Sequence, residues 1–112
     1  MANKIWGSNN EPLKIQFITD THYYSRKGGT EGKAYDKAES KSQKVIKDSD
    51  LVIKAGFDML CEDKSTDIVV LAGDTTRDGE IESHKEFIEM LRDLKKRGKR
   101  VYVITATHDF RA

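Results

Sequence analysis

The sequence predicts an α/β fold built on a parallel sheet, in the order strand, helix, strand, helix, strand. Three short runs are rich in Ile and Val, contain neither Pro nor Gly and are continuous rather than alternating: residues 14–19, 67–72 and 100–105. Continuous apolar runs are typical of strands that are buried on both faces of a parallel sheet. Two segments with helical periodicity separate them, which indicates right-handed crossovers between parallel strands.

The first predicted helix covers about residues 42–62. Four apolar residues recur in it at spacings near 3.6 and form one face, namely Ile46, Ile53, Phe57 and Leu60. Gly56 lies inside this helix and costs about 1 kcal/mol relative to Ala. We therefore expect one side of this helix to pack against the sheet.

The second predicted helix covers about residues 84–97. Ser83 and Glu86 match the capping-box pattern S-x-x-E at its start, and Gly98 suits a left-handed stop at its end. Its apolar stripe consists of Phe87, Ile88, Leu91 and Leu94. Three cations in its last turn, residues 95–97, complement the helix dipole.

Residues 21–41 form the longest segment without a predicted element. The segment is polar, contains glycine and has no clear period. Loops of this length within a compact domain are often functional flaps. We therefore predict a single domain over residues 1–112, in which 21–41 is a long loop on the active-site side.

The layout leaves one face of the sheet without cover. If the strand order does not reverse, right-handed crossovers place both helices on the same face. Apolar patches of that size mark a missing partner or a missing part of the fold. We expect an incomplete α/β unit that packs against the C-terminal remainder of its fold or against a second copy.

Length and composition restrict the class of protein. With 112 residues the chain makes one domain or less, and its 37% apolar and 35% charged residues indicate a polar globular protein. The formal charge of +1 gives no general attraction to nucleic acid or to a membrane. A single cysteine excludes an internal disulfide. The N-terminus lacks a signal-peptide core, so we expect a cytoplasmic protein, although a chain with its leader removed would look the same.

Ionisable residues follow each of the three predicted strands. Asp20 and His22 come after the first, Asp74 after the second, and His108 with Asp109 after the third. Ligands bind beyond the carboxyl ends of the strands in an open parallel sheet, so these side chains should converge at one edge. Carboxylates and imidazoles together suit Mn, Fe or Zn ions, and one carboxylate can bridge two such ions.

These motifs resemble those of the calcineurin-like metallophosphoesterases, over the amino-terminal half of that family's fold. The family carries D-x-H, then G-D-x-x-x-x-G, then G-N-H-[DE], each at a strand end. This chain has "DTH" at 20–22, "GDTTRDG" at 73–79 and "ATHD" at 106–109. The resemblance covers nearly the whole chain and includes the helix start "ESHKEF" at 82–87. It implies a β-α-β-α-β half of an α/β sandwich, with helices mainly on one face.

The resemblance also implies a role for each residue. Asp20 and His22 would hold the first metal and Asp74 would bridge two metals. His108 would steady or protonate the departing oxygen, and Asp109 would orient His108. The implied activity is hydrolysis of a phosphoester by a metal-dependent phosphatase or phosphodiesterase, with the substrate left open among nucleotides, phosphoproteins, nucleic acids and phospholipids.

Two departures from the family pattern limit that prediction. Thr107 stands where the family has the Asn that binds the second metal, so its hydroxyl is the candidate ligand at that position, although a poorer one, and Ala106 stands where the family has Gly. The later His ligands of the family have no counterpart within the 112 residues. We therefore expect at most one ion here, and a fragment of a longer hydrolase that is weakly active or inactive alone.

Three other readings of the sequence stay open. The first is a non-catalytic α/β module that descends from the same fold and serves in binding. The second is a small nucleotide- or flavin-binding α/β domain whose acids contact ribose or water. The third is nucleic-acid binding through the basic residues 95–100, which the near-neutral net charge argues against.

Overall fold

The computed structural model describes residues 12–29, 31–41 and 48–110. They form three strands, three α-helices and two short 3₁₀ helices. In chain order these are β1 (Gln16–Ile18), η3 (Arg26–Gly28), α1 (Lys33–Lys41), α2 (Ser49–Glu62), β2 (Ile68–Ala72), α3 (Ile81–Lys96), β3 (Arg100–Ile104) and η4 (Thr107–Phe110).

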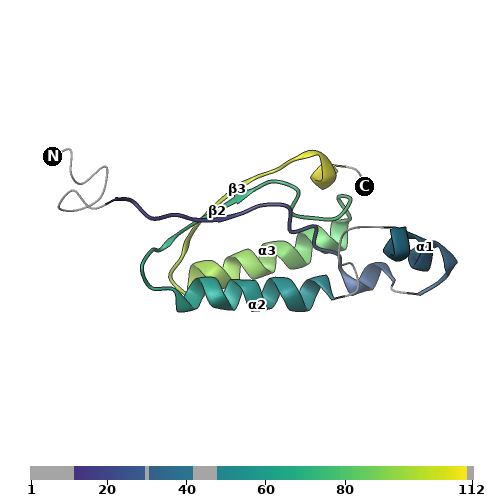
Figure 1. The fold of residues 1–112 in the computed structure, drawn as a ribbon, viewed down its shortest axis with the longest axis horizontal. Helices are drawn as coiled ribbons and strands as arrows, with labels where there is room; N and C mark the ends of the chain where they lie inside the picture. Colours follow the sequence, from purple (N-terminus) through teal and green to yellow (C-terminus); the bar gives the residue numbers. More distant parts are fainter. Residues whose placement is uncertain (1–11, 30, 42–47, 111–112) are drawn as a thin grey trace.

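The sheet is parallel, which confirms the predicted α/β class, and its order β1-β2-β3 shows that the strand order does not reverse. Phe17 pairs with Val70, which pairs with Tyr102. Figure 1 shows α2 and α3 lying side by side beneath the strands. Both crossovers therefore place their helices on the same face, as right-handed connections require.

The hydrophobic core lies between this face and the two helices. Val69 and Leu71 point into it from β2 and are 0% and 1% exposed. The helices contribute Ile53, Phe57, Cys61, Phe87 and Leu94, and Tyr23 joins from the segment after β1. Full burial of one such aliphatic side chain stabilises the fold by about 1.5–3 kcal/mol, so the covered face holds this small domain together.

The opposite face of the sheet is uncovered in the part of the chain that the structure describes. Phe17, Tyr102 and Ile104 are 65%, 56% and 62% exposed there. The expectation that the strands are buried on both faces is therefore wrong for the described chain, and the expectation of one uncovered face is confirmed. The partner that the sequence predicts for this face stays a prediction.

The first predicted helix matches α2 from Ser49 onwards. Ile53 and Phe57 are buried, and Leu60 packs partly against the core. Ile46 and the rest of residues 42–47 lie outside the described residues. None of the described helices combines the length and the apolarity that crossing a membrane requires.

The start of α3 differs from the prediction. The helix begins at Ile81 with Glu80 as its N-cap, so Ser83 lies in its first turn and does not cap it. Ser83 is fully buried and accepts a hydrogen bond from Ser25 N, while Glu86 accepts one from Tyr23 Oη. Both side chains that matched a capping box are therefore used to attach the segment after β1.

The apolar stripe of α3 also differs from the prediction, at one of its four residues. Phe87 and Leu94 are buried and Leu91 is partly buried, whereas Ile88 is 46% exposed. Met90 takes the place predicted for Ile88. Residues 87, 90, 91 and 94 follow the helical spacing i, i+3, i+4, i+7, and Ile88 falls about 100° away from that line.

The predicted loop 21–41 contains regular structure. Tyr23 forms a parallel bridge with Thr76, η3 follows, and residues 33–41 form α1. The sequence of α1 is rich in Lys and Ala, which favour helix, but it is polar overall. Its apolar residues are too few to mark a helical face in the sequence, which is why this helix was missed.

Candidate functional site

The chain continues its parallel pairing beyond the ends of β1 and β2. Asp20 N donates to Gly73 O at 3.2 Å, and His22 N donates to Asp74 O at 3.0 Å. Tyr23 N then donates to Thr75 O at 2.9 Å. These bonds hold the segment with Asp20 and His22 beside the segment with Asp74.

Backbone conformation marks the same residues. Asp20, His22 and Asp74 have φ of +55°, +45° and +49°, and they are the non-glycine residues with positive φ in the described chain. The left-handed region costs an L-residue about 1–2 kcal/mol, and Asp and His enter it more readily than most others. Such outliers cluster at functional sites, so strain and candidate ligands coincide here.

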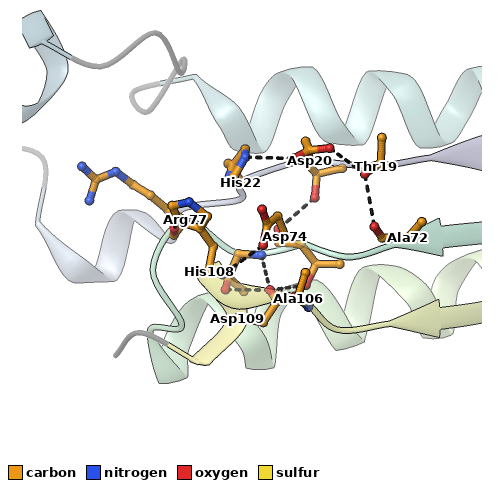
Figure 2. A network of polar contacts seen from close by, with 12 residues as sticks. Thr19, Asp20, His22, Ala72, Asp74, Arg77, Ala106, His108 and Asp109 are labelled. Atoms are coloured by element: carbon orange, nitrogen blue, oxygen red, sulfur yellow. Dashed lines mark hydrogen bonds and ion pairs between the residues drawn. The ribbon is translucent and has the colours of Figure 1, made fainter.

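The three side chains converge, as the sequence predicts. One donor atom from each of Asp20, His22 and Asp74 lies within 4.8 Å of the other two. Asp20 Oδ1 and His22 Nε2 are 3.6 Å apart, and Figure 2 shows all three side chains around one point at the strand ends. No Lys or Arg among the described residues forms an ion pair with Asp20 or Asp74. We call these three residues the ligand trio.

The geometry of the ligand trio fits a divalent cation. Two donor atoms that both contact one Zn²⁺ at about 2.0–2.2 Å can be at most about 4.4 Å apart. The trio spans at most 4.8 Å, so a small rotation of the exposed Asp20 side chain suffices to close it. Two carboxylate oxygens and one imidazole nitrogen are a donor set that Zn, Fe and Mn accept.

The chain after β3 contacts the trio through its backbone and through His108. His108 N donates to Asp74 Oδ1 at 2.9 Å. The His108 ring meets the His22 ring edge-on, with centroids 4.8 Å apart. Its Nδ1 lies 2.6 Å from Arg77 O and 3.2 Å from Asp78 Oδ1 (Figure 2 labels Arg77 and His108). All three strand ends therefore meet at one place.

The hydrogen bonds of Asp109 differ from the role that the family resemblance implies for it. Its Oδ1 accepts from Thr75 Oγ1 at 2.8 Å, Thr76 N at 2.8 Å and Thr76 Oγ1 at 3.0 Å. Its Oδ2 accepts from Ala106 N at 3.0 Å, and its backbone carbonyl lies 2.9 Å from His84 Nε2. The carboxylate beside His108 belongs to Asp78, so Asp109 is a structural group that fastens η4 to the β2 end.

The charge state of Asp109 follows from these contacts. Burial by itself raises the pKa of a carboxyl group, and Asp109 is only 4% exposed. The hydrogen bonds from Thr76 N, Ala106 N and Thr75 favour the carboxylate more strongly and lower its pKa to about 2. Asp109 is therefore an anion at every physiological pH, held by donors rather than by a cation.

Asp78 is the residue that sequence reasoning missed. It lies four positions after Asp74 within "GDTTRDG" and forms an ion pair with Arg77 at 2.9 Å. An acid inside the second motif was visible, but nothing in the sequence distinguishes it from an ordinary surface acid. Only the packing of η4 against this loop brings Asp78 to His108.

Thr107 and Ala106 precede His108. Thr107 opens η4, is exposed, and has no side-chain hydrogen bond in the described part of the chain. Its role as a ligand stays a prediction. Ala106 packs closely on Gly73, where an added Cβ would lie 2.6 Å from Ala106 Cβ and where φ is +88°. Glycine at 73 is therefore required for the ends of β2 and β3 to approach each other.

Comparison with known proteins adds no family to this geometry. Neither the family models nor the curated proteins searched match this chain.

Proposed function

We propose that this chain carries the first part of a metal-dependent phosphoester-hydrolysing site, with the ligand trio as the seat of one divalent cation. The observation that carries the proposal is the convergence of Asp20, His22 and Asp74 donor atoms within 4.8 Å. The order of the motifs "DTH", "GDTTRDG" and "ATHD" supports a phosphoester rather than another substrate, through their resemblance to metallophosphoesterases.

The chain's own groups fit that chemistry. When bound, a cation at the trio would supply the positive charge that attracts phosphoryl oxygens and acidifies water. Arg77 O can only accept a hydrogen bond, so we assign the proton of the neutral His108 ring to Nδ1. Nε2 is then the atom that takes up or gives a proton, which suits a donor to a departing oxygen. Asp78 holds the ring in that orientation.

A thermal-shift titration with Mn²⁺ tests the cation site. A ligand that binds only the folded state at about 100 times its Kd adds about 2.7 kcal/mol to the free energy of unfolding. We expect Mn²⁺ to raise the Tm of the wild-type chain and Asp74→Asn to abolish the rise. Asp78→Asn is the matched control, because this carboxylate lies outside the trio, and it should keep the rise.

The phosphoester part of the proposal has a separate readout. We expect slow, Mn²⁺-dependent cleavage of bis-p-nitrophenyl phosphate by this chain, because a single cation and three protein ligands form only part of a two-metal site. His108→Gln should lower that rate and leave the Mn²⁺-induced Tm shift intact. A wild-type Tm that Mn²⁺ does not change would refute the metal site and with it the hydrolase.

A non-catalytic binding module is the second candidate. The hydroxyl of Thr107, in the place where the resembled family has an amide ligand, favours it, because a hydroxyl is a poorer metal ligand. This candidate predicts the same Tm shift with Mn²⁺ but no turnover, and a phosphoester that is recovered unchanged after binding. Turnover in the wild type that His108→Gln reduces would exclude it.

A further inference from the structure

A shallow groove lies directly beside the ligand trio, between the segment after β1 and α1. Its volume is about 330 Å³. Its walls carry two aromatic rings, two small apolar residues and one charge of each sign: Tyr24, Tyr35, Ala34, Ala38, Glu31 and Arg77. We call it the tyrosine groove. Small-molecule sites have volumes from about 300 Å³ and combine apolar walls with a few polar groups.

The tyrosine groove is connected to the trio through neighbouring residues, although no trio residue lines the groove itself. Tyr24 follows His22 by two residues, so their Cα atoms are at most about 7.6 Å apart. Arg77 belongs to both places, because its carbonyl contacts His108 Nδ1 at 2.6 Å while its side chain lines the groove. Figure 2 shows the Arg77 side chain extending away from Asp74 and His22. A molecule bound at the trio can therefore continue into the groove.

The lining favours a flat, uncharged ring. The Tyr24 and Tyr35 rings have centroids 6.3 Å apart and planes tilted by 38°, so together they offer an angled aromatic surface. Desolvation raises the pKa of both phenols, that of Tyr35 to about 12, so both rings stay neutral near pH 7. Aromatic side chains of this kind bind planar rings by stacking and edge contacts.

Two polar groups can bind the edge of such a ring. Arg77 Nη1 pairs with Asp78 Oδ2 at 2.9 Å, but the buried Nε–H of Arg77 has no hydrogen-bond partner within residues 12–29, 31–41 and 48–110. A buried donor without a partner calls for an acceptor. The Glu31 carboxylate supplies the complementary acceptor at the same groove.

A larger groove between α2, α3 and η3 lacks these properties. Its volume is about 430 Å³, and four of its charged residues, Arg26, Lys27, Asp50 and Glu86, are already paired within the groove. Arg26 pairs with Asp50 at 3.1 Å, and Glu86 accepts from Tyr23 Oη at 2.6 Å and lies 3.9 Å from Lys27 Nζ. A ligand there would have to break these contacts, so volume alone does not select a site.

We propose that the tyrosine groove binds the aromatic part of the substrate, so that the phosphoesters handled at the trio are those with a planar ring, as in a nucleotide or an aryl phosphate. This inference rests on the proposed function for the phosphoryl end, and on the groove alone for the ring end.

Calorimetry in the presence of Mn²⁺ tests this inference. The binding affinities of three phosphoesters are compared: adenosine 5′-monophosphate, phenyl phosphate and glycerol 1-phosphate. Removing one stacking aromatic typically weakens binding by fivefold to a hundredfold or more. We expect the two ring-containing esters to bind about tenfold tighter than glycerol 1-phosphate, and Tyr35→Ala to remove that difference. If the nucleotide binds more tightly than phenyl phosphate, the groove recognises a nucleoside. If the two bind equally, the groove recognises only a planar ring.

Two further variants serve as controls. Tyr35→Phe keeps the ring and should keep the preference. Tyr102→Ala removes an exposed tyrosine from the uncovered sheet face and should change nothing. The inference is overturned if glycerol 1-phosphate binds wild type as tightly as the nucleotide, or if Tyr35→Ala, folded by circular dichroism, binds the nucleotide with unchanged affinity.

Adenosine without phosphate or metal separates this inference from the proposed function. Binding of adenosine that depends on Tyr35 supports the groove even where Mn²⁺ causes no Tm shift, which would refute the trio alone. Conversely, a Mn²⁺ shift that depends on Asp74, together with no binding of adenosine to wild type, would overturn the groove and leave the trio in place.

Discussion

The two ends of the sheet use the same residue types in opposite ways. At the amino end, Lys99 is buried and its Nζ donates to Asp63 O at 2.9 Å and Thr66 O at 2.6 Å, while Arg100 pairs with Asp67 at 3.1 Å. At the carboxyl end, donor atoms of Asp20, Asp74 and His22 lie together, and no Lys or Arg in the described part of the chain forms an ion pair with either acid.

The two ends of the sheet differ in whether their charged side chains are paired within the chain. Cations at the amino end are satisfied by carbonyls and carboxylates of the same chain, so that end serves stability. The acids at the carboxyl end gather at left-handed residues that the fold must hold against strain. The internally balanced end gives no reason to propose a ligand, whereas the convergence of acids at the other end is the reason we propose a cation there.

Asp109 is an exception at the carboxyl end, because its carboxylate is satisfied by hydrogen-bond donors of the same chain. Its carboxylate is held by Thr75, Thr76 and Ala106 rather than by the trio. Position at that edge is therefore insufficient for a ligand. What distinguishes Asp20 and Asp74 is that their oxygens share one space with an imidazole nitrogen.

The largest expected effect on stability comes from Asp109→Asn. The shift of the Asp109 pKa from 3.8 to about 2 corresponds to about 2 kcal/mol of stability near pH 7, which the amide loses. Because the folded-state pKa is depressed, this stability is fully present above about pH 4 and disappears as the pH falls toward about 2. Urea denaturation at pH 7 and pH 3 should show the gap between wild type and variant shrinking in acid; a gap independent of pH would contradict the charge-based explanation.

Lys99→Met should lower the free energy of unfolding by nearly as much. The variant keeps most of the apolar stem but leaves the carbonyls of Asp63 and Thr66 without their donor, at a cost of about 1–3 kcal/mol. Chemical denaturation with and without Mn²⁺ measures the loss, which should be the same in both conditions. A loss that Mn²⁺ reverses would mean that the two ends of the sheet are coupled and would contradict separate roles for them.

The smallest effect should come from Asp20→Asn in the absence of metal. The substitution removes one carboxylate from an acidic cluster on an exposed side chain, so we expect a change within about 0.5 kcal/mol, toward higher stability. With Mn²⁺ present the same variant should lose most of the Tm rise of the wild type. A large loss of stability without metal would show that Asp20 is a structural group like Asp109.

Local patterns predicted the framework of this protein because their causes are local. Apolar runs and helical periodicity identified the three strands and the two crossover helices, and the strand ends located Asp20, His22 and Asp74 at one edge. The sequence analysis missed α1, because this helix is short and polar overall and has few apolar residues. It also misread the start of α3, because Ser25 and Tyr23 claim the side chains that matched a cap.

The sequence by itself indicated a parallel sheet, one uncovered face if the strand order does not reverse, and the residues of the ligand trio. Tertiary structure alone decided which carboxylate reaches His108, because the turn of η4 buries Asp109 under Thr75 and Thr76 and leaves Asp78 beside the ring. It also decided that Tyr24, Tyr35 and Arg77 line one groove. Periodicity and strand-end position act over a few residues, whereas these contacts join segments up to 53 residues apart and depend on how whole elements pack.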